Sequence, residues 1–337
     1  MAGRLVEMRE IRAARERIAP HVARTPLVSM ASAGVVLKAE SLQPSGSFKL
    51  RGAFHALLQL SDEQRARGVV AHSSGNHAIA VAMAAARLGV QATVVMPDDA
   101  PAVKRSWTAA LGARVEIVGP ASSERAERAA ALAKERGLAL VEPYDSHTVI
   151  AATGTIALEV LEDLPGAAAE PPELYVPVSG GGLVAGIAAA AKLSDPRVRV
   201  IGVEPELAAD ALASRRAGER IALPAEQMAR TLADGLRVQK VGERPWPHLV
   251  AYVDELVTVS EAEIREAMRR IAAEARLVAE PSGAVPVAAA IEGRGGRHRP
   301  PASRVAVLSG GNVDLAPYAE IIAGVRGTPT ASAWSSA

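Results

Sequence analysis

The chain has 337 residues, 49% of them hydrophobic, which is enough for a sizeable core in one large or two modest domains. Its 38 basic and 37 acidic residues leave a net charge of +1, and only 3% are aromatic, so we expect neither a nucleic acid nor a membrane surface as partner. The absence of cysteine excludes disulfides, thiol nucleophiles and thiolate metal sites. No run resembles a signal peptide or a membrane span, which predicts a cytoplasmic protein.

Hydrophobic periodicity predicts a chain of alternating strands and helices. An amphipathic helix is expected within residues 5–22 and a short strand at 35–40. Two alternations of strand and helix follow, with strands predicted at 69–71, 93–96, 115–118, 138–141, 174–178, 199–203 and 305–308. An extended run is expected at 250–259 and a helix at 261–276. Such alternation is typical of parallel βαβ units whose binding loops lie at the carboxyl ends of the strands.

The stretch 45–52 (SGSFKLRG), which we call the lysine loop, places Lys49 between a small-residue turn and a predicted helix start, with Ser47 as the expected cap of that helix. A lysine that forms a Schiff base must lose its proton near neutral pH, so burial or a neighbouring cation must lower a pKa that is ordinarily about 10.4. Lys49 is therefore our candidate for a reactive amine. The alternative is a solvated lysine in the first turn of an amphipathic helix.

Three further polar loops each follow a predicted strand. They are the asparagine loop 73–77 (SSGNH), the glycine loop 179–183 (SGGGL) and the serine loop 309–312 (SGGN). Glycines in such a turn let backbone N–H groups surround an oxyanion at a helix N-terminus. Each loop alone could equally serve packing or a tight turn.

Together, and in this order, these loops resemble the fold-type II pyridoxal 5′-phosphate enzymes, in particular the threonine/serine dehydratase and serine racemase family. The resemblance runs from about residue 18 to 315 and includes the motifs TPL at 25–27, GTIALE at 154–159, ADG at 233–235 and EPSG at 280–283. It implies an α/β fold similar to tryptophan synthase β, with two doubly wound domains and the cofactor between them. We expect a large domain from 1–66 and 146–325, a small domain at 67–145, a flexible tail at 326–337, and a homodimer.

The resemblance also implies a role for each loop. Lys49, beside Phe48, would form the Schiff base with pyridoxal phosphate, Ser309 would meet the pyridine nitrogen and Asn76 the phenolic oxygen. The cofactor phosphate would lie in the loop made by Ser179, Gly180, Gly181, Gly182 and Leu183. The substrate carboxylate would bind Ser73, Asn76 and His77, although His77 could equally just complete the turn. A neutral serine at the pyridine nitrogen weakens the electron sink, which favours β-elimination over transamination.

The function that follows is dehydration of L-threonine or L-serine, through an aminoacrylate, to a 2-oxo acid and ammonia, with Lys49 removing the α-proton. Racemisation of serine needs a second acid/base on the opposite face, and Ser74 holds that position in serine racemase-like relatives; it could also be an ordinary turn residue. Dehydration of 3-hydroxyaspartate or another β-hydroxy amino acid stays open. A non-catalytic amino-acid-binding protein would require the loss of Lys49 or of the phosphate loop.

A cation site is expected at Glu204, Asp210 and the carbonyl of Ala208, since hard oxygen ligands suit Mg²⁺, and also Ca²⁺ or Mn²⁺. Its spacing resembles the divalent-cation site of serine racemase-like enzymes, and two surface carboxylates are the alternative.

Asp234 and Glu280 are expected to organise the active site by holding the residues that contact the cofactor and substrate. Ser179 stands where relatives have glycine, and Ala152-Thr153 stands where many have Gly-Gln. With Tyr144 and His147 nearby, the second departure leaves the substrate open.

Overall fold

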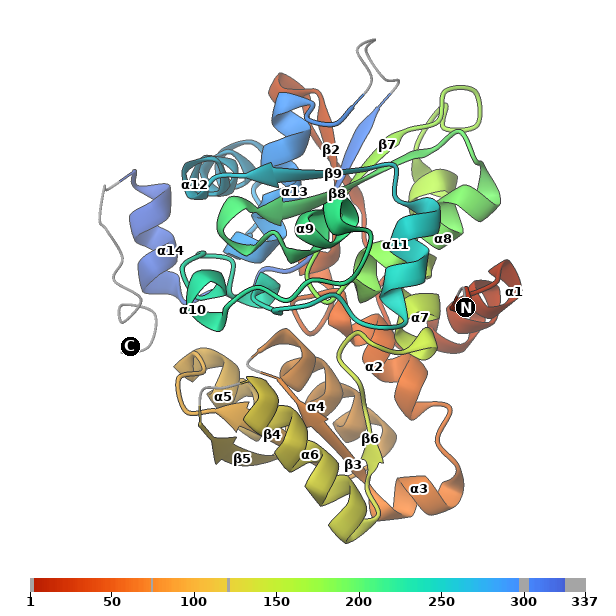
Figure 1. Ribbon diagram of the computed structural model, residues 1–337, viewed down its shortest axis with the longest axis vertical. Coiled ribbons are helices and arrows are strands. Elements are labelled where there is room, and N and C mark those ends of the chain that lie inside the picture. The colour runs from red at the N-terminus through yellow and green to blue at the C-terminus, as the bar shows by residue number, and fades with distance from the viewer. Residues whose placement is uncertain (1–2, 74, 120–121, 297–302, 325–337) are drawn as a thin grey trace.

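The fold consists of two parallel sheets flanked by helices, in a computed structural model that describes residues 3–73, 75–119, 122–296 and 303–324. Ser74 and the predicted tail at 326–337 lie outside the described residues. Figure 1 shows the smaller sheet and its helices at the lower end of the molecule, below the larger sheet. The predicted α/β class is therefore confirmed, whereas the exact domain bounds stay a prediction.

The larger sheet has six strands in the order β1-β2-β10-β7-β8-β9. All neighbours are parallel except β1 and β2, which pair antiparallel at one edge. The strands are β1 Leu27–Met30, β2 Val35–Ala39, β7 Glu173–Pro177, β8 Arg199–Pro205, β9 Glu255–Val259 and β10 Arg304–Leu308. Every residue of β7 is buried, as expected for a central strand covered by helices on both faces.

Two apolar clusters cover the two faces of this sheet. Alternate residues of β7 enter different clusters, Leu174 and Val176 the first and Tyr175 the second. Helices of the first cluster are α1 Met8–Ile18, α7 His147–Asp163, α8 Gly182–Ser194 and α11 Pro245–Tyr252, and those of the second are α12 Glu261–Arg270, α13 Pro281–Glu292 and α14 Leu315–Ile322. The short helices α9 Asp210–Ala217 and α10 Ala225–Met228 follow β8.

The smaller sheet has four parallel strands in the order β5-β4-β3-β6. Its strands are β3 Val69–His72, β4 Ala92–Pro97, β5 Arg114–Val118 and β6 Ala139–Leu140, and its helices are α4 Asn76–Leu88, α5 Ala102–Ala110 and α6 Ser122–Arg136. Helices α2 Lys49–Leu57 and α3 Asp62–Arg67 lead into this part of the chain. Because its strands are parallel, the loops that follow them open at one edge, toward the larger sheet (Figure 1).

Two local predictions were wrong, and a third was right in extent but differs in helix type. The run 250–259 is not extended throughout, because α11 begins at Pro245, a residue favoured in the first helical turn, and continues to Tyr252 before β9 starts. The helix predicted at 261–276 is present to within one residue, as α12 to Arg270 followed by one π-helical turn, Ile271–Ala275. Ser47 does not cap α2; its hydroxyl is buried without a hydrogen-bond partner.

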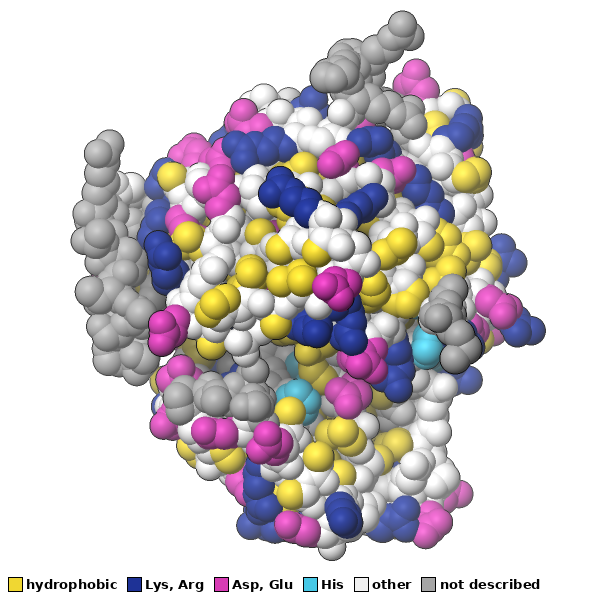
Figure 2. All heavy atoms as spheres, viewed as in Figure 1, with side chains coloured by type: hydrophobic (Ala, Val, Ile, Leu, Met, Phe, Trp, Pro, Cys, Tyr) yellow, Lys and Arg dark blue, Asp and Glu magenta, His cyan; other side chains and the backbone are white. Residues whose placement is uncertain are grey.

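On the face shown in Figure 2, acidic and basic side chains are interspersed over both parts of the molecule. Within the described ranges, no helix is long and apolar enough to cross a membrane.

Candidate active site

Lys49 lies at the N-terminus of α2, where the lysine loop meets the end of β10. Ser47 pairs with Gly310 in an isolated antiparallel bridge, and the Phe48 N–H donates to the Ser309 carbonyl oxygen at 3.0 Å. Two loops that are far apart in the sequence are therefore held together by their backbones. This contact brings Ser309 beside the segment that carries the candidate amine.

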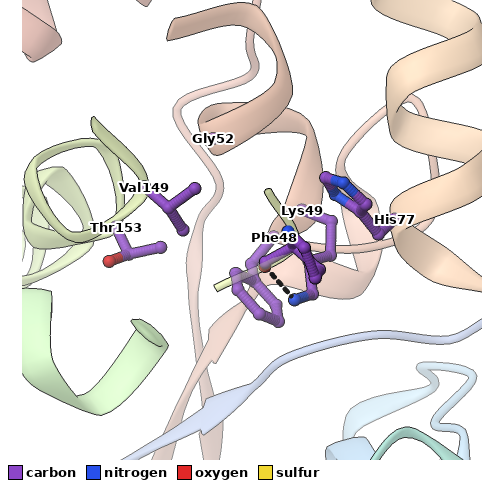
Figure 3. A pocket seen from close by; sticks show the side chains of 7 residues that line it. Phe48, Lys49, Gly52, His77, Val149 and Thr153 are labelled. Carbon is purple, nitrogen blue, oxygen red and sulfur yellow. Dashed lines mark hydrogen bonds between the residues drawn. The ribbon is translucent and has the colours of Figure 1, made fainter. Parts of the chain in front are cut away.

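The Lys49 amine points into a small cavity between the two sheets. Its Nζ donates to the Pro143 carbonyl oxygen at 2.7 Å, and the cavity is lined by Phe48, Gly52, His77, Val149 and Thr153 (Figure 3). Burial lowers the pKa of Lys49 to about 8, the direction that an amine working near neutral pH requires. A freely solvated lysine, the alternative considered above, is not what the structure shows.

The glycine loop after β7 has the shape of an anion cradle at the start of α8. Gly181 adopts a left-handed φ of 89°, and a Cβ on it would lie 2.8 Å from Pro245. The ring of Tyr144 packs against Gly180, so a side chain has no room there either. No side chain caps α8, and its first N–H groups are left for another acceptor.

Ser179 supplies a second observation at this loop. Its hydroxyl is buried and has no hydrogen-bond partner, an expensive state unless something else occupies the site. Uncapped N–H groups and an unpartnered hydroxyl together fit a bound phosphate. Leu183 packs into the first apolar cluster, so only its backbone is available to the cradle. Thr153 reaches the same loop, since its hydroxyl donates to the Gly182 carbonyl oxygen at 2.9 Å.

Asn76 is held in one orientation at the first residue of α4. Its Nδ2 donates to Glu280 Oε1 at 2.5 Å, and its Oδ1 accepts from Asn312 Nδ2 at 2.9 Å. Asn312 also donates to the Ser45 carbonyl oxygen at 2.9 Å, which ties the serine loop to the lysine loop. The sequence analysis noted Asn312 only as part of its loop and missed this bridging role.

The rest of the asparagine loop is arranged around the N-terminus of α4. Ser73 Oγ accepts from the Gly75 N–H at 3.0 Å, and Ser74 lies outside the described residues. The His77 ring is buried, and its Nε2 lies 3.0 Å from the Val141 carbonyl oxygen. Burial and the neighbouring Lys49 lower the pKa of His77 to about 3, so its ring is neutral. One ring nitrogen is thus committed to the fold, which favours the turn-completing role over carboxylate binding by the side chain.

Two cations near the asparagine loop were missed by the sequence analysis. Lys104 of α5 is buried, and its Nζ lies 2.7 Å from Asp234 Oδ2 and 3.7 Å from Glu280 Oε2. Burial lowers the pKa of Lys104, but these carboxylates outweigh it and raise the value to about 12. Burial, and to a smaller extent the positive charge of Arg125 on α6, lower the pKa of His72 to about 4. Nothing in the flanking sequence distinguishes either cation from a surface residue.

The predicted cation ligands lie together where the end of β8 leads into α9. Glu204 and Asp210 are buried, as is Ala208, and Glu204 accepts the N–H groups of Ala211 and Leu212 at 2.9 and 2.8 Å. Both oxygens of Asp210 lack a hydrogen bond of normal geometry. Burial raises the pKa of Asp210 to about 7, and the nearby backbone amides offset only part of that rise.

Two buried carboxylates so close together need either protons or a cation. Burial, followed by the charge of Asp210, raises the pKa of Glu204 well above its ordinary value. The donor set fits a hard cation completed by water, although the described residues contain no group of three or more His, Asp or Glu side chains arranged around a metal. The alternative of two solvated surface carboxylates is wrong, because both side chains are buried.

The other residues flagged around the substrate side lie in different places. Tyr144 packs on the glycine loop, and burial raises its pKa to about 12. The ring of His147 instead lies 3.1 Å from the Arg4 carbonyl oxygen, away from the residues that line the lysine cavity.

Comparison with known proteins identifies the group of enzymes to which this cavity belongs. Residues 18–310 match the family model described as pyridoxal-phosphate dependent enzyme. The chain belongs to that family. A catabolic L-threonine dehydratase of Staphylococcus aureus is 38% identical over 326 residues, covering 94% of this chain and 92% of the relative. A serine racemase of Arabidopsis thaliana is 41% identical over 315 residues, covering 90% and 92%.

The solved structures that resemble this pyridoxal-phosphate-dependent enzyme include the same two kinds of enzyme. The threonine deaminase of T.th. superposes with a TM-score of 0.83 at 43% identity, covering 91% of this chain and 99% of that one. Maize serine racemase superposes with a TM-score of 0.87 at 36% identity, covering 95% and 98%. The relatives are therefore divided between dehydratases and racemases.

Proposed function

We propose that this enzyme is an ammonia-lyase that dehydrates L-threonine or L-serine to the corresponding 2-oxo acid and ammonia. The observation that carries the proposal is the Lys49 amine, whose pKa is lowered to about 8 by burial, in a cavity that adjoins the uncapped glycine loop of α8. Amine and anion cradle are the two parts that a pyridoxal phosphate site must combine. The dehydratase and deaminase among the relatives supply the reaction class.

The residues present fit the cofactor that the family uses. Pyridoxal phosphate supplies a carbonyl carbon for an amine and a conjugated ring that accepts electrons from the α-carbon. Lys49 would hold it covalently, with Phe48 beside the amine, and Ser309 would meet its ring nitrogen. Asn76 would meet its phenolic oxygen. The phosphate would lie on the backbone of 179–183 and the Ser179 hydroxyl.

The chain's own groups can carry the remaining steps. The substrate carboxylate would bind at the N-terminus of α4, where Gly75 and Asn76 begin the helix and Ser73 Oγ is close by. The Lys49 amine, with its lowered pKa, would take the α-proton, and the β-hydroxyl would leave as water once protonated. His77 is neutral, so it places no positive charge beside Lys49 that would weaken the amine as a base.

Serine racemisation is the second candidate, because the Arabidopsis relative at 41% identity is a serine racemase. It requires an acid/base on the face of the α-carbon opposite to Lys49. Ser74 is our candidate for that role, by its resemblance to the serine that serine racemase-like relatives have at this position. Loss of a proton to one face and its return from the other would interconvert the enantiomers.

Incubation of the purified protein with pyridoxal phosphate and Mg²⁺ tests both candidates. L-threonine, L-serine, D-serine and 3-hydroxyaspartate are supplied separately, and 2-oxo acid and chiral amino acid are measured together. The proposal expects 2-oxo acid from L-threonine or L-serine without the opposite enantiomer. Interconversion of serine enantiomers as the main reaction would favour the racemase. Oxo acid from 3-hydroxyaspartate alone would change the substrate, and binding without any turnover would support a non-catalytic amino-acid-binding protein.

We also propose that Glu204, Asp210 and the Ala208 carbonyl bind Mg²⁺, or Ca²⁺ or Mn²⁺ in its place. The support is the unpartnered, buried carboxylate of Asp210 beside a second buried carboxylate.

The enzyme is further proposed to be a homodimer, by its resemblance to the family. Sedimentation at micromolar concentration should then give twice the chain mass of 34.9 kDa, and a single species at 34.9 kDa would contradict it.

A further inference from the structure

Four charged side chains form a cluster inside the larger part of the molecule, on the far side of the helix turn that carries Lys49. They are Lys38 of β2, Glu40 directly after the end of that strand, Arg51 of α2 and Glu159 of α7. Lys38, Glu40 and Arg51 have no exposed surface, and Glu159 is 5% exposed. We call this set the buried ionic cluster. The proposed reaction uses none of its members.

Arg51 makes the largest number of contacts in the cluster and joins three segments. Its guanidinium donates to both oxygens of Glu40, at 2.9 and 2.8 Å, and to both oxygens of Glu159, at 2.6 and 2.8 Å. It also donates to the Thr155 hydroxyl at 3.2 Å. Two bidentate carboxylates fix both the position and the rotation of a planar guanidinium, which a single-point contact does not.

Lys38 completes the cluster from the sheet. Its Nζ donates to Glu159 Oε2 and to the Thr25 carbonyl oxygen, each at 2.6 Å. The Thr25 hydroxyl donates to Glu40 Oε1, also at 2.6 Å. The cluster therefore uses the TPL motif at 25–27 and the last residue of the GTIALE motif at 154–159, to which the sequence analysis gave no role.

The charges of the cluster balance without solvent. Two cations face two carboxylates, and every charged group is hydrogen-bonded. Burial alone would raise the pKa of Glu40, yet Arg51 outweighs this and the value is lowered. The pKa of Arg51 is raised, because Glu40 and Glu159 outweigh its own burial. Glu40 and Arg51 are thus ionised in the folded protein.

The cluster contacts the first turn of α2 on the side that faces away from the reactive amine. Lys49 and Arg51 are two residues apart, or roughly 200° around a helix, so their side chains leave it on opposite sides. No side chain caps this helix start, and Ser47 contributes no hydrogen bond from its hydroxyl. The backbone contacts of residues 46–48 with residues 309–311 and the Arg51 side chain hold the turn.

Apolar packing of similar volume could replace the whole cluster for stability, since buried ion pairs are often no better than hydrophobic packing in that respect. It could not reproduce the directional contacts to η2 (Glu40–Leu42) and α7 at once. We propose that Arg51 is a positioning residue, which through Glu40 and Glu159 fixes the first turn of α2 and so places the Lys49 amine against the Pro143 carbonyl oxygen. This inference rests on the proposed function only in taking Lys49 as the reactive amine.

The test measures Lys49 in the cofactor-free protein as well as in the loaded enzyme. The charge-balanced variant Arg51→Met with Glu40→Gln removes the bidentate contact without stranding a carboxylate. The pH dependence of Lys49 acylation, followed by mass spectrometry, gives the apparent pKa of the amine. We expect it to rise by at least about one pH unit as the turn loosens and water enters, with at least about a tenfold loss of kcat at little change in KM.

Two further variants make the result decisive. Arg51→Lys keeps the positive charge but loses the planar guanidinium that binds each carboxylate at two points. It should raise the Lys49 pKa by a smaller amount than the double variant. If the double variant does not fold, the result for Arg51→Lys decides the test. Arg15→Met removes an exposed arginine that contacts both oxygens of Glu162 on the same helix α7, and it should leave Lys49 unchanged.

Wild-type acylation and kcat in folded Arg51 variants would overturn the inference, and so would an equal shift in Arg15→Met. A failure of the proposed function looks different, because the wild-type protein itself would then turn over none of the substrates.

Discussion

Replacing Lys104 with methionine should make the stability of the protein depend on pH in a defined direction. Lys104 is the buried cation between Asp234 and Glu280, so its removal strands two carboxylates. The Asp234 side chain keeps 29% of its surface accessible, whereas Glu280 keeps 2%. Water can therefore hydrate Asp234 but not Glu280, and Glu280 is the group that must take up a proton in the variant.

The magnitude follows from the pKa of Glu280. Burial raises it from an ordinary value of 4.5 to about 7 even with Lys104 in place. The wild type already carries this difference, about 3 kcal/mol, so the extra pH dependence of the variant comes only from the further rise that the loss of Lys104 causes, about 1.4 kcal/mol for each pKa unit. A carboxyl whose pKa is raised by folding stabilises the folded state fully below pH 4.5, and that contribution is lost as the pH rises through the folded-state value. The deficit of the variant must then grow from pH 5 to pH 8.

Urea unfolding of the cofactor-free protein at about pH 5, 6.5 and 8 measures this directly. We expect Lys104→Met to lose about 1 kcal/mol more, relative to wild type, at the highest pH than at the lowest, because Glu280 should stay protonated in the variant up to pH 8 whereas it ionises in the wild type. Lys192→Met is the matched control, because Lys192 pairs at 2.8 Å with the partly exposed Asp254 and should cost under about 1 kcal/mol at every pH. A Lys104→Met deficit that is constant, or largest at pH 5, would refute the reasoning.

Three more predictions concern the chemistry. Lys49→Ala should abolish turnover and the visible absorbance of bound cofactor, so retained activity would contradict the assignment of the amine. Ser74→Ala should lower racemisation at least about tenfold more than dehydration, measured with L-serine by chiral chromatography, and equal losses would count against two opposed bases. Asp210→Asn should remove the rise in melting temperature that Mg²⁺ gives the wild type, whereas an unchanged Mg²⁺ effect would place the cation elsewhere.

The fold was predictable because its strands are buried on both faces and read as short apolar runs. The segments around Leu174 and Val305 lie in β7 and β10, as predicted, and the alternation after residue 69 gave a parallel sheet. The run at 250–259 failed for a local reason, since Pro245 starts a helix that ends in an apolar run, and only Asp254 and Glu255 separate that run from the apolar residues of β9. Apolar content alone does not separate such neighbours.

The site was predictable where chemistry requires an unusual local sequence. Lys49 follows a small-residue turn and Gly181 needs a left-handed backbone, so both leave a trace in the sequence. Lys104 and Arg51 leave none, because their importance comes from carboxylates that the fold brings to them from distant segments. A charged residue in a helix has the same local signature whether it faces water or a buried partner.

The position of Thr153 has a practical consequence for redesigning substrate range. Its side chain lines the lysine cavity and also donates to the Gly182 carbonyl oxygen at 2.9 Å, within the loop proposed to hold phosphate. The helices α7 and α8 approach so closely here that a Cβ at Gly186 would collide with the Ile150 carbonyl oxygen. Neither helix can shift alone to make room. A library that enlarges residue 153 to admit other amino acids will therefore also select on how well the protein retains its cofactor.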